Sequence, residues 1–373
     1  MTVPLILVFC HVEDAIDLRH ARIKFLNLDG AHIPGLNADG LQTSGDVFLR
    51  NGFHATGRVR LLGAGIGGNF ECSGGKFENP ATAENPEART LNAESLTVEG
   101  SIFLGSGFSA DGVLNLRHAK TGPLSDEVKS WPQPGKLLLD GFDYETIAPG
   151  SLTGAKDRLE WLGRQPERSF RPQPYEQLIR VLHRMGHESD AREIAIAKQE
   201  ALRKYGGLSW WAKFWNRFLG LLIGHGYEPW KVLPHIAVML ALGFITFSIA
   251  DQNAMMRPTK KRVYMNPCFA ELTEEYMQGG WVKIPKLVYL RPGVRLWGPG
   301  INLPADYPRF HPWLHSADVF FPFVDLHQES YWLPRAEESG ENFYRIYIWL
   351  HILLGWLLTS IGVVGLTGIV KKD

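Results

Sequence analysis

The sequence predicts a mixed fold: an N-terminal right-handed parallel β-helix-like solenoid, a helical hairpin adaptor and two C-terminal transmembrane helices. Three observations lead to this prediction. Short segments of alternating apolar and polar residues repeat along residues 1–150, a helical periodicity replaces them from Gly154, and two long uncharged apolar runs follow. A chain of 373 residues is long enough for two soluble units together with a membrane segment.

The repeats follow the pattern Gly-x-apolar-x-apolar. A unit this short cannot bury its apolar face alone, whereas stacked coils can, so a short fixed period is typical of a solenoid. We therefore expect a solenoid over residues 12–148, with two units of about 11 or 12 residues in each coil. Residues 78–90 and 121–135 interrupt the pattern and predict loop insertions. The segments that fit are Gly45–Leu49, Gly57–Leu61, Gly68–Cys72, Gly100–Leu104, Gly112–Leu116 and, loosely, Gly135–Leu139.

One glycine-rich stretch within the repeats, Gly63–Gly68, contains the G-x-G-x-x-G spacing of dinucleotide-binding loops. That motif binds a pyrophosphate where a strand turns into a helix, but another strand unit follows here, so we favour a turn. The three cysteines, Cys10, Cys72 and Cys268, are far apart and indicate neither a disulfide framework nor a metal pair. Because the formal net charge is zero, we expect no nucleic-acid partner.

The pattern becomes helical in residues 151–206, where apolar residues recur on one helix face before and after a turn at Gly186–Ser189. These residues predict a helical hairpin like those of tetratricopeptide-type repeats. His183 and His187 are spaced as a metal pair could be, but the glycine between them and the lack of a third ligand favour a hairpin turn. Residues 207–231 predict an amphipathic helix in the headgroup layer of a membrane, with packing on the hairpin as the alternative.

Two apolar runs near the C-terminal end, Val232–Ala250 and Ile346–Val370, contain no Asp, Glu, Lys or Arg. Because about 20 helical residues cross a bilayer core, both runs predict membrane spans; buried helices of a soluble protein are the alternative. Lys371 and Lys372 follow the second run and no signal peptide is evident, so we expect both termini in the cytoplasm. Small residues in the second run predict close packing in a two-helix hairpin or a homo-oligomer. These residues are Gly355, Gly362, Gly365 and Gly368.

The segment between the two runs, residues 251–345, is rich in proline and aromatic residues and too apolar to be disordered. It holds the densest set of possible metal ligands in the chain, although Pro312 is inconsistent with a helical pair of histidines. The apolar stretch Val319–Val324 is too short to span a bilayer and could enter it as a re-entrant segment. The candidate metal ligands are His311, His315 and Asp318, with Asp325, His327 and Glu329 nearby.

The outer face of the solenoid is the candidate for binding a protein partner. Strand residues that alternate with the inward-facing Val47, Leu49, Val59 and Leu61 are expected to point outward. Phe48 and Phe103 occupy equivalent places in a duplication of 55 residues, and a repeated exposed aromatic side chain indicates an interaction surface. Packing of both rings under the insertion loops is the alternative. The predicted surface consists of Phe48, Arg50, Arg58, Arg60 and Phe103.

Three parts of the chain resemble a bacterial group of membrane-anchored, pentapeptide-repeat-like proteins that often carry the name membrane-associated oxidoreductase. These parts are Leu36–Gly75, Tyr175–Gly206 and the C-terminal end from Val324. The resemblance implies a multi-pass protein of the bacterial inner membrane. No flavin, nicotinamide, haem or iron–sulfur motif is present, so no cofactor is predicted and an unknown metal is left open. We therefore expect a membrane-anchored binding or scaffold protein, and the alternative is an oxidoreductase with an unidentified cofactor or metal in residues 251–345.

Overall fold

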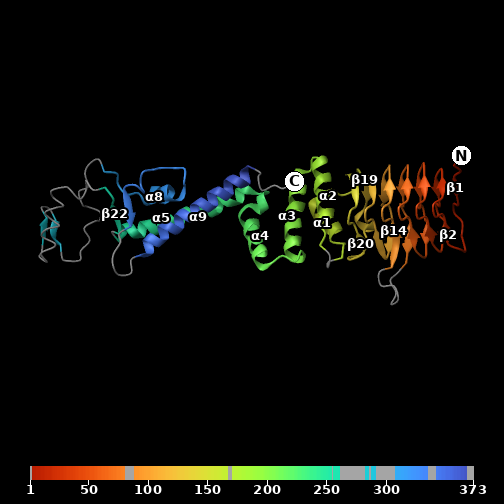
Figure 1. The fold of residues 1–373 in the computed structure, drawn as a ribbon, viewed down its shortest axis with the longest axis horizontal. Coiled ribbons are helices and arrows are strands. Elements are labelled where there is room, and N and C mark those ends of the chain that lie inside the picture. Colours follow the sequence, from red (N-terminus) through yellow and green to blue (C-terminus); the bar gives the residue numbers. More distant parts are fainter. Residues whose placement is uncertain are drawn as a thin grey trace. The chain divides into compact units, whose positions relative to one another are not determined.

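The computed structural model describes residues 2–79, 88–166, 170–253, 255–260, 282–284, 287–290, 307–334 and 342–367. The chain divides into two compact units, Met1–Asn216 and Arg217–Asp373. Stacked strands and the helices α1 to α3 form the first unit, and the long helices α5 and α9 dominate the second (Figure 1). About half of residues 251–345, together with Gly368, Lys371 and Lys372, lie outside the described residues.

The first unit is a parallel β-solenoid. Each full coil contains four short strands, as in the coil of β4, β5, β6 and β7, and equivalent strands of successive coils pair in parallel. The register pairs Leu36 with Val59 and Val47 with Phe70, so one coil contains two of the sequence repeats, as predicted. The coils stack because each one buries the apolar edge of its neighbour.

The strands form three sheets. The 11-stranded sheet contains β1 (Leu5–Ile6), β4 (Leu26–Asn27), β8 (Val47–Phe48), β12 (Phe70–Glu71), β16 (Ile102–Leu104), β19 (Lys120–Asp126), β15 (Thr97–Val98), β11 (Gly65–Ile66), β7 (Gln42–Thr43) and β3 (Arg22–Ile23), with β21 (Asp143–Ile147) beside β19. The 6-stranded sheet contains β2 (Ile16–Asp17), β6 (Leu36–Asn37), β10 (Val59–Arg60), β14 (Arg89–Asn92), β18 (Val113–Asn115) and β20 (Leu137–Leu138). The 4-stranded sheet contains β17 (Ser109–Asp111), β13 (Lys76–Glu78), β9 (His54–Ala55) and β5 (His32–Ile33).

Three predicted boundaries are wrong. The solenoid begins before residue 12, because β1 already pairs with β4. Residues 121–126 are not part of an insertion: they lie in β19, which pairs with β15, β16 and β21 and joins two sides of the solenoid. The insertion predicted at residues 78–90 is shorter at both ends, since Glu78 closes β13 and Arg89 opens β14; residues 80–87 lie outside the description.

The solenoid interior is apolar and fully buried. Val47, Leu49, Val59 and Leu61 are each 0% exposed, which confirms the predicted alternation. One column of the core consists of phenylalanines from three coils, Phe53, Phe77 and Phe108, with successive ring centroids 5.3 Å apart. Burial of each such ring stabilises the fold by about 1.5–3 kcal/mol, so the core is the main source of stability.

Many turns of the solenoid share the sequence Leu-Asn-x-x followed by a residue with positive φ. The Asn side chain accepts a hydrogen bond from the backbone N–H two residues later, as Asn27 does from Asp29 at 2.9 Å. Gly30 (φ 64°), Gly40 (φ 68°) and Ser95 (φ 58°) occupy the left-handed position that follows. Asparagine closes such turns by replacing a backbone hydrogen bond, and the motif marks corners on two sides of the solenoid, after β4 of the 11-stranded sheet and after β6, β14 and β18 of the 6-stranded sheet.

Helices cover the C-terminal end of the solenoid core. Helices α1 (Ala155–Leu162), α2 (Gln173–Arg184) and α3 (Glu188–Tyr205) contribute buried apolar residues to the same core cluster as the strands. Gln177 Nε2 donates to the Tyr144 carbonyl at 2.8 Å, and Gln173 similarly bonds the backbone of Gly141 and Phe142. The amide side chains therefore satisfy exposed backbone groups of the last coil, and the helices remove an open sheet edge.

A buried ion pair fastens α1 to the solenoid. Arg158, which is 0% exposed, donates from Nη1 and Nη2 to the two carboxylate oxygens of Asp126, each at 2.8 Å. Trp131 Nε1 also donates to Asp126, and Arg158 Nε donates to the Leu152 carbonyl. A bidentate guanidinium–carboxylate pair restricts orientation as well as distance, so it orients α1 on strand β19.

Helix α4 (Trp210–Ile223) follows within the segment predicted to be amphipathic, and the short turns η2 (Gly224–Gly226) and η3 (Pro229–Lys231) complete that segment. Its first turns expose several large aromatic side chains: Trp210, Trp211, Phe214 and Trp215 are each about half exposed or more. The predicted apolar face is therefore accessible in this part of the helix, as a helix that lies in a headgroup layer requires.

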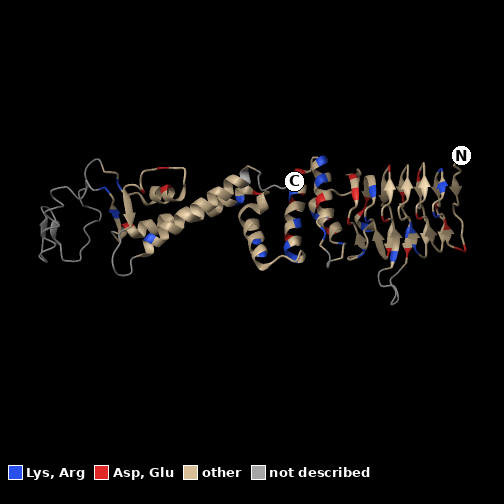
Figure 2. Ribbon diagram, in the orientation of Figure 1, with Lys and Arg blue, Asp and Glu red and all other residues tan. Residues whose placement is uncertain are grey.

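The second unit contains two helices that are long and apolar enough to cross a membrane. They are α5 (Val232–Gln252, 21 residues) and α9 (Asn342–Leu366, 25 residues). Only 17% and 28% of their most apolar windows is buried inside the protein, whereas a core helix of a soluble protein is mostly buried. Figure 2 shows that charged residues are confined to the ends of both helices. Helix α9 begins four residues earlier than the predicted span.

Shorter elements lie beside these helices. Helix α8 (Pro312–Phe320) packs against α5 and α9. The antiparallel pair β22 (Met256–Pro258) and β25 (Trp332–Pro334) connects the chain just after α5 with the chain that follows α8. A second antiparallel pair consists of β23 (Val282–Ile284) and β24 (Leu287–Leu290).

Candidate functional site

The outer face of the 11-stranded sheet carries one column of side chains that includes both predicted aromatic residues. The register aligns Asn27, Phe48, Glu71, Phe103 and Ser125 in successive coils. Phe48 and Phe103 are half-buried, while the residues on either side of each in its strand are buried. They therefore point outward, about 10 Å apart with Glu71 between them, because neighbouring strands are about 4.8 Å apart.

The charge of Arg50 is neutralised within this face. Arg50 Nε donates to Asp29 at 3.1 Å and Nη1 donates to Glu71 at 2.5 Å, while the guanidinium carbon lies 4.3 Å from the centre of the Phe48 ring. Burial lowers the pKa of Arg50, but the hydrogen bonds and attraction to Asp29 and Glu71 outweigh it and raise the pKa. Arg50 thus orients Phe48 and Glu71 and contributes little free positive charge.

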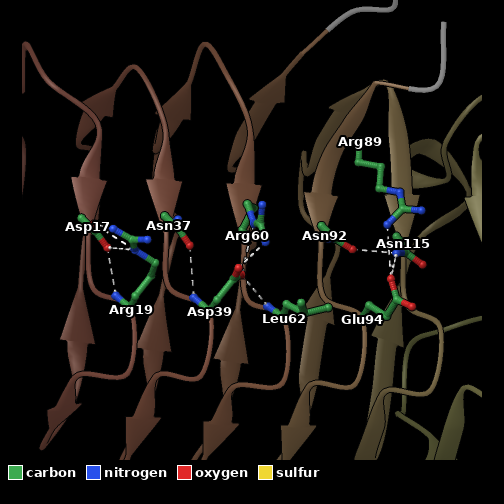
Figure 3. A network of polar contacts seen from close by, with 10 residues as sticks. All are labelled: Asp17, Arg19, Asn37, Asp39, Arg60, Leu62, Arg89, Asn92, Glu94 and Asn115. Atoms are coloured by element: carbon green, nitrogen blue, oxygen red, sulfur yellow. Dashed lines mark hydrogen bonds and ion pairs between the residues drawn. The ribbon is translucent and has the colours of Figure 1, made fainter. Parts of the chain in front are cut away.

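Arg58 and Arg60 belong to a different sheet. Arg60 lies in β10 of the 6-stranded sheet and its guanidinium pairs with Asp39 of the preceding coil (Figure 3). Arg58 precedes this strand and is exposed as a residue. Partial burial of its guanidinium, and then the positive charges of nearby Arg60 and Arg89, lower its pKa. The five residues predicted as one partner surface therefore lie on two sides of the solenoid: Phe48, Arg50 and Phe103 on the 11-stranded sheet, and Arg58 and Arg60 on the 6-stranded sheet.

The 6-stranded sheet has an outer polar column of its own, which Figure 3 shows. The register aligns Asp17, Asn37, Arg60, Asn92 and Asn115. Most of these side chains are engaged in closing turns or in pairing with adjacent coils; for example, Asn115 Nδ2 donates to Asn92 Oδ1 at 2.6 Å. Because its polar atoms are bonded within the protein, this column stabilises the stack and is a weaker candidate for binding.

Three histidines form a further column on the 4-stranded sheet, which the sequence analysis missed. His11 pairs with His32, which pairs with His54, and the successive ring centroids are 6.5 Å and 5.4 Å apart. His54 Nε2 lies 3.0 Å from Glu78 Oε2. Their spacing in the sequence, about one coil apart, was the signal that could have revealed the column. In the described ranges no three His, Cys, Asp or Glu side chains are grouped to hold a metal ion.

The predicted metal ligands of the second unit lie on or beside α8 but point to different surroundings. His311 precedes the helix and is exposed, whereas His315 is fully buried between the rings of Phe247 and Phe310, at 4.7 Å and 5.2 Å. Neither ring nitrogen of His315 bonds to a residue in the described part of the chain. The metal site at His311, His315 and Asp318 stays a prediction.

The Asp318 carboxylate accepts three backbone hydrogen bonds. Leu326 N–H donates to Oδ1 at 2.5 Å, and the N–H groups of Gln328 and Glu329 donate to Oδ2 at 2.8 and 2.7 Å. The pKa of Glu329 is raised, first by burial of its carboxyl group and then by the negative charges of Asp318 and Asp325. Asp318 therefore holds the chain that returns from α8 against the helix, which is a structural role that its sequence position did not indicate.

The buried histidine of α9, His351, contacts α8. Its Nε2 donates to the Ser316 carbonyl at 3.2 Å, and Ser316 Oγ donates to the Leu240 carbonyl of α5 at 3.1 Å. His235, by contrast, is near the start of α5, where its Nδ1 lies 2.8 Å from the Lys231 carbonyl. The two histidines do not face each other.

Comparison with protein-family models, with curated proteins and with solved structures found no match. The functional argument therefore rests on the geometry of the chain itself. Two features stand out: the aromatic column of the solenoid and the contact of α8 with the two long apolar helices.

Proposed function

We propose that this chain is a membrane-anchored binding or scaffold protein that presents the outer face of its solenoid to a protein partner. The observation that supports this most directly is the column of Phe48, Glu71 and Phe103 on the 11-stranded sheet. Helices α5 and α9 are the anchor in this proposal. The same proposal includes a right-handed coil, a helical hairpin adaptor, a location in the bacterial inner membrane and cytoplasmic termini.

The column lies on a face suited to binding. Its backbone hydrogen bonds are made to neighbouring coils, and every inward residue beneath it is fully buried. Because such a face is already rigid, it loses little conformational entropy when a partner binds. The free energy of binding is therefore reduced only slightly by the ordering of the surface. Half-exposed aromatic rings on a rigid face are the side chains that most often anchor protein interfaces.

The arrangement also defines the chemistry of the partner. Two apolar rings about 10 Å apart match a polyproline-II segment with apolar side chains three residues apart, because this helix has three residues per turn and rises about 3.1 Å per residue. Glu71 lies between the rings and its carboxylate accepts the Arg50 Nη1 hydrogen bond. We therefore expect a partner segment with two apolar anchors and a hydrogen-bond donor between them.

Site-specific photocrosslinking of the full-length protein in its own membranes tests this proposal. A photoreactive aromatic residue at Ser125, the next position of the column after Phe103, should crosslink a distinct protein. The same probe at Gln42, which is exposed on β7, serves as the matched control and should not. The double variant Phe48→Ser/Phe103→Ser should abolish the crosslink at Ser125.

Two outcomes would overturn the proposal. A probe at Ser125 that captures nothing, or a crosslink that the double variant leaves unchanged, would show that the aromatic column is not the binding surface. The variant Phe48→Leu/Phe103→Leu, which keeps apolar volume, should retain both folding and the crosslink. A stoichiometric flavin, haem or redox metal in the purified protein would instead favour the oxidoreductase.

A further inference from the structure

Helix α8 packs closely against a glycine of each long apolar helix, through the Ser316 side chain on α5 and through the Phe320 backbone on α9. A Cβ atom on Gly243 of α5 would lie 2.1 Å from Ser316 Oγ, and one on Gly355 of α9 would lie 2.1 Å from the Phe320 carbonyl oxygen. Such contacts are possible only because both positions lack a side chain. Glycines in apolar helices commonly mark places where another helix packs closely.

These contacts lie deep along the two helices. Leu240, whose carbonyl accepts the Ser316 hydrogen bond, precedes the end of α5 at Gln252 by about 18 Å at 1.5 Å per residue. Gly355 follows the start of α9 at Asn342 by about 20 Å on the same basis. A bilayer core is about 30 Å thick, so the C-terminal end of α8 reaches past the middle of any bilayer that α5 and α9 span.

The chain around α8 enters and leaves on the same side. Strand β25, which follows, pairs with β22, which begins four residues after α5 ends. Trp332 Nε1 donates to the Pro308 carbonyl at 3.0 Å, which ties the outgoing segment to the incoming one. The tip between them contains a turn in which Val324 N–H donates to the Phe321 carbonyl.

The exposed side chains of α8 and of the tip that follows it are mostly apolar, up to the ion pair of Asp325 with His327 on the returning chain. Phe323 at the tip is 83% exposed and Trp313 is 51% exposed, although both side chains are costly to leave in water. The Trp313 ring lies 6.1 Å from that of Phe244, which is itself exposed on α5. Exposed apolar side chains of α5 and α8 therefore adjoin each other.

The polar groups of α8 are turned away from that surface. His351 and the Leu240 carbonyl take up the polar atoms of Ser316, and Asp318 is saturated by backbone N–H groups. Hydrocarbon cannot hydrogen-bond to a helix, so a helix inserted in it must satisfy its polar groups within the protein. This accounts for the presence of a histidine in the middle of α9.

We propose that residues 312–324 form a re-entrant membrane segment, in which α8 descends between α5 and α9, the Phe323 tip contacts lipid acyl chains inside the bilayer, and the paired Asp325 and His327 begin the return of the chain. The inserted segment begins earlier than the stretch Val319–Val324 suggested by the sequence. The inference rests on the membrane anchoring in the proposed function, but not on the solenoid partner.

Spin labels on the full-length protein in phosphatidylcholine liposomes test this proposal. Cys10 and Cys268 are replaced by serine, the buried Cys72 is retained, and single labels are placed at Phe323→Cys, Leu242→Cys or Arg19→Cys. The rate at which each spin label collides with dissolved oxygen is compared with its rate of collision with a water-soluble nickel chelate. The ratio of the two rates measures how deep the label lies in the bilayer. We expect the Phe323 and Leu242 labels to collide with oxygen and to be shielded from nickel, and the Arg19 label on the solenoid to collide with nickel.

The outcomes separate the two proposals. If the Phe323 label collides with nickel while the Leu242 label is shielded, α8 lies outside the bilayer and the re-entrant segment is refuted, but the anchor stands. If both labels collide with nickel, the anchor fails as well. Gly355→Ala should displace the tip and increase nickel collisions at Phe323 several-fold. The control Gly362→Ala should not, because its added Cβ would meet only the Val232 side chain at 3.3 Å.

Discussion

Removal of Arg158 should destabilise the solenoid more than removal of any exposed ion pair. The Arg158 and Asp126 side chains are 0% and 3% exposed, and two hydrogen bonds of 2.8 Å join them. The variant Arg158→Met leaves the Asp126 carboxylate buried with Trp131 Nε1 as its remaining side-chain donor. Breaking one partner of a buried pair costs about 3–5 kcal/mol, a large fraction of the roughly 5–15 kcal/mol that stabilises a domain.

The double variant Asp126→Leu/Arg158→Met should recover most of that loss. It leaves no uncompensated charge, and an apolar replacement of a buried pair is often neutral. The two groups that lose a partner, Trp131 Nε1 and the Leu152 carbonyl, belong to residues that are partly exposed and can bond to water. We therefore expect a coupling free energy of about 2 kcal/mol or more between the two positions.

Urea unfolding followed by alkylation of Cys72 measures both effects, because this thiol is 0% exposed inside the solenoid. The exposed pair of Arg19 and Asp17 provides the control, and Arg19→Met should leave the midpoint unchanged within error. If Arg158→Met shifts the midpoint no further than Arg19→Met, or if the double variant is as unstable as the single one, the ion pair does not fasten α1 to the solenoid.

Three further predictions concern the solenoid core. Burial raises the pKa of the Cys72 thiol. At mildly alkaline pH the folded protein should therefore be alkylated at the partly exposed Cys10 and not at Cys72. Peptide mapping measures the alkylation at each site, and equal labelling would contradict the burial of Cys72. The Tyr144 hydroxyl is buried without a partner among the residues described, so Tyr144→Phe should keep or raise the free energy of unfolding by up to about 1 kcal/mol, and a marked loss in urea unfolding would reveal a missed hydrogen bond. Phe77→Ala, in the middle of the phenylalanine column, should cost about 3–5 kcal/mol in the same assay, whereas a cost similar to that of a surface substitution would show that the column does not support the stack.

The solenoid could be predicted from the sequence because its signal is local. Each short strand places one residue inward and the next outward, so the alternation is present within every repeat, and the coil period follows from the spacing of the repeats. The Leu-Asn turns were equally visible in the sequence at Leu26, Leu36, Leu91 and Leu114. They were missed because the repeats were aligned on glycines, although the asparagine and the positive-φ residue define the corner.

Strand β19 was mistaken for an insertion because local propensity and tertiary pairing disagree there. Gly122 and Pro123 are typical turn residues, but Gly122 N–H donates to the Gly100 carbonyl and Pro123 lies opposite Thr146 in the register. The neighbouring coils determine the backbone path at this point, and strand preference is known to yield to such context. A prediction from the repeat period alone could not anticipate a strand that joins two sides of the stack.

In the second unit, the packing of helix α8 could not be predicted from the sequence either. The glycines of the second apolar run were expected to serve a two-helix hairpin or a dimer, and the structure divides them: Gly362 faces Val232 of α5, but Gly355 accommodates the backbone of α8. A glycine in an apolar helix indicates that another part of the protein packs closely against that position. It does not indicate which part, because glycine has no side chain that could be complementary to a partner. The hydrogen bonds that identify the partner join Ser316 to Leu240 and His351, which are remote in sequence. The position of His351 opposite Gly243 and Ser316 makes it the polar contact through which a third helix can lie between the other two.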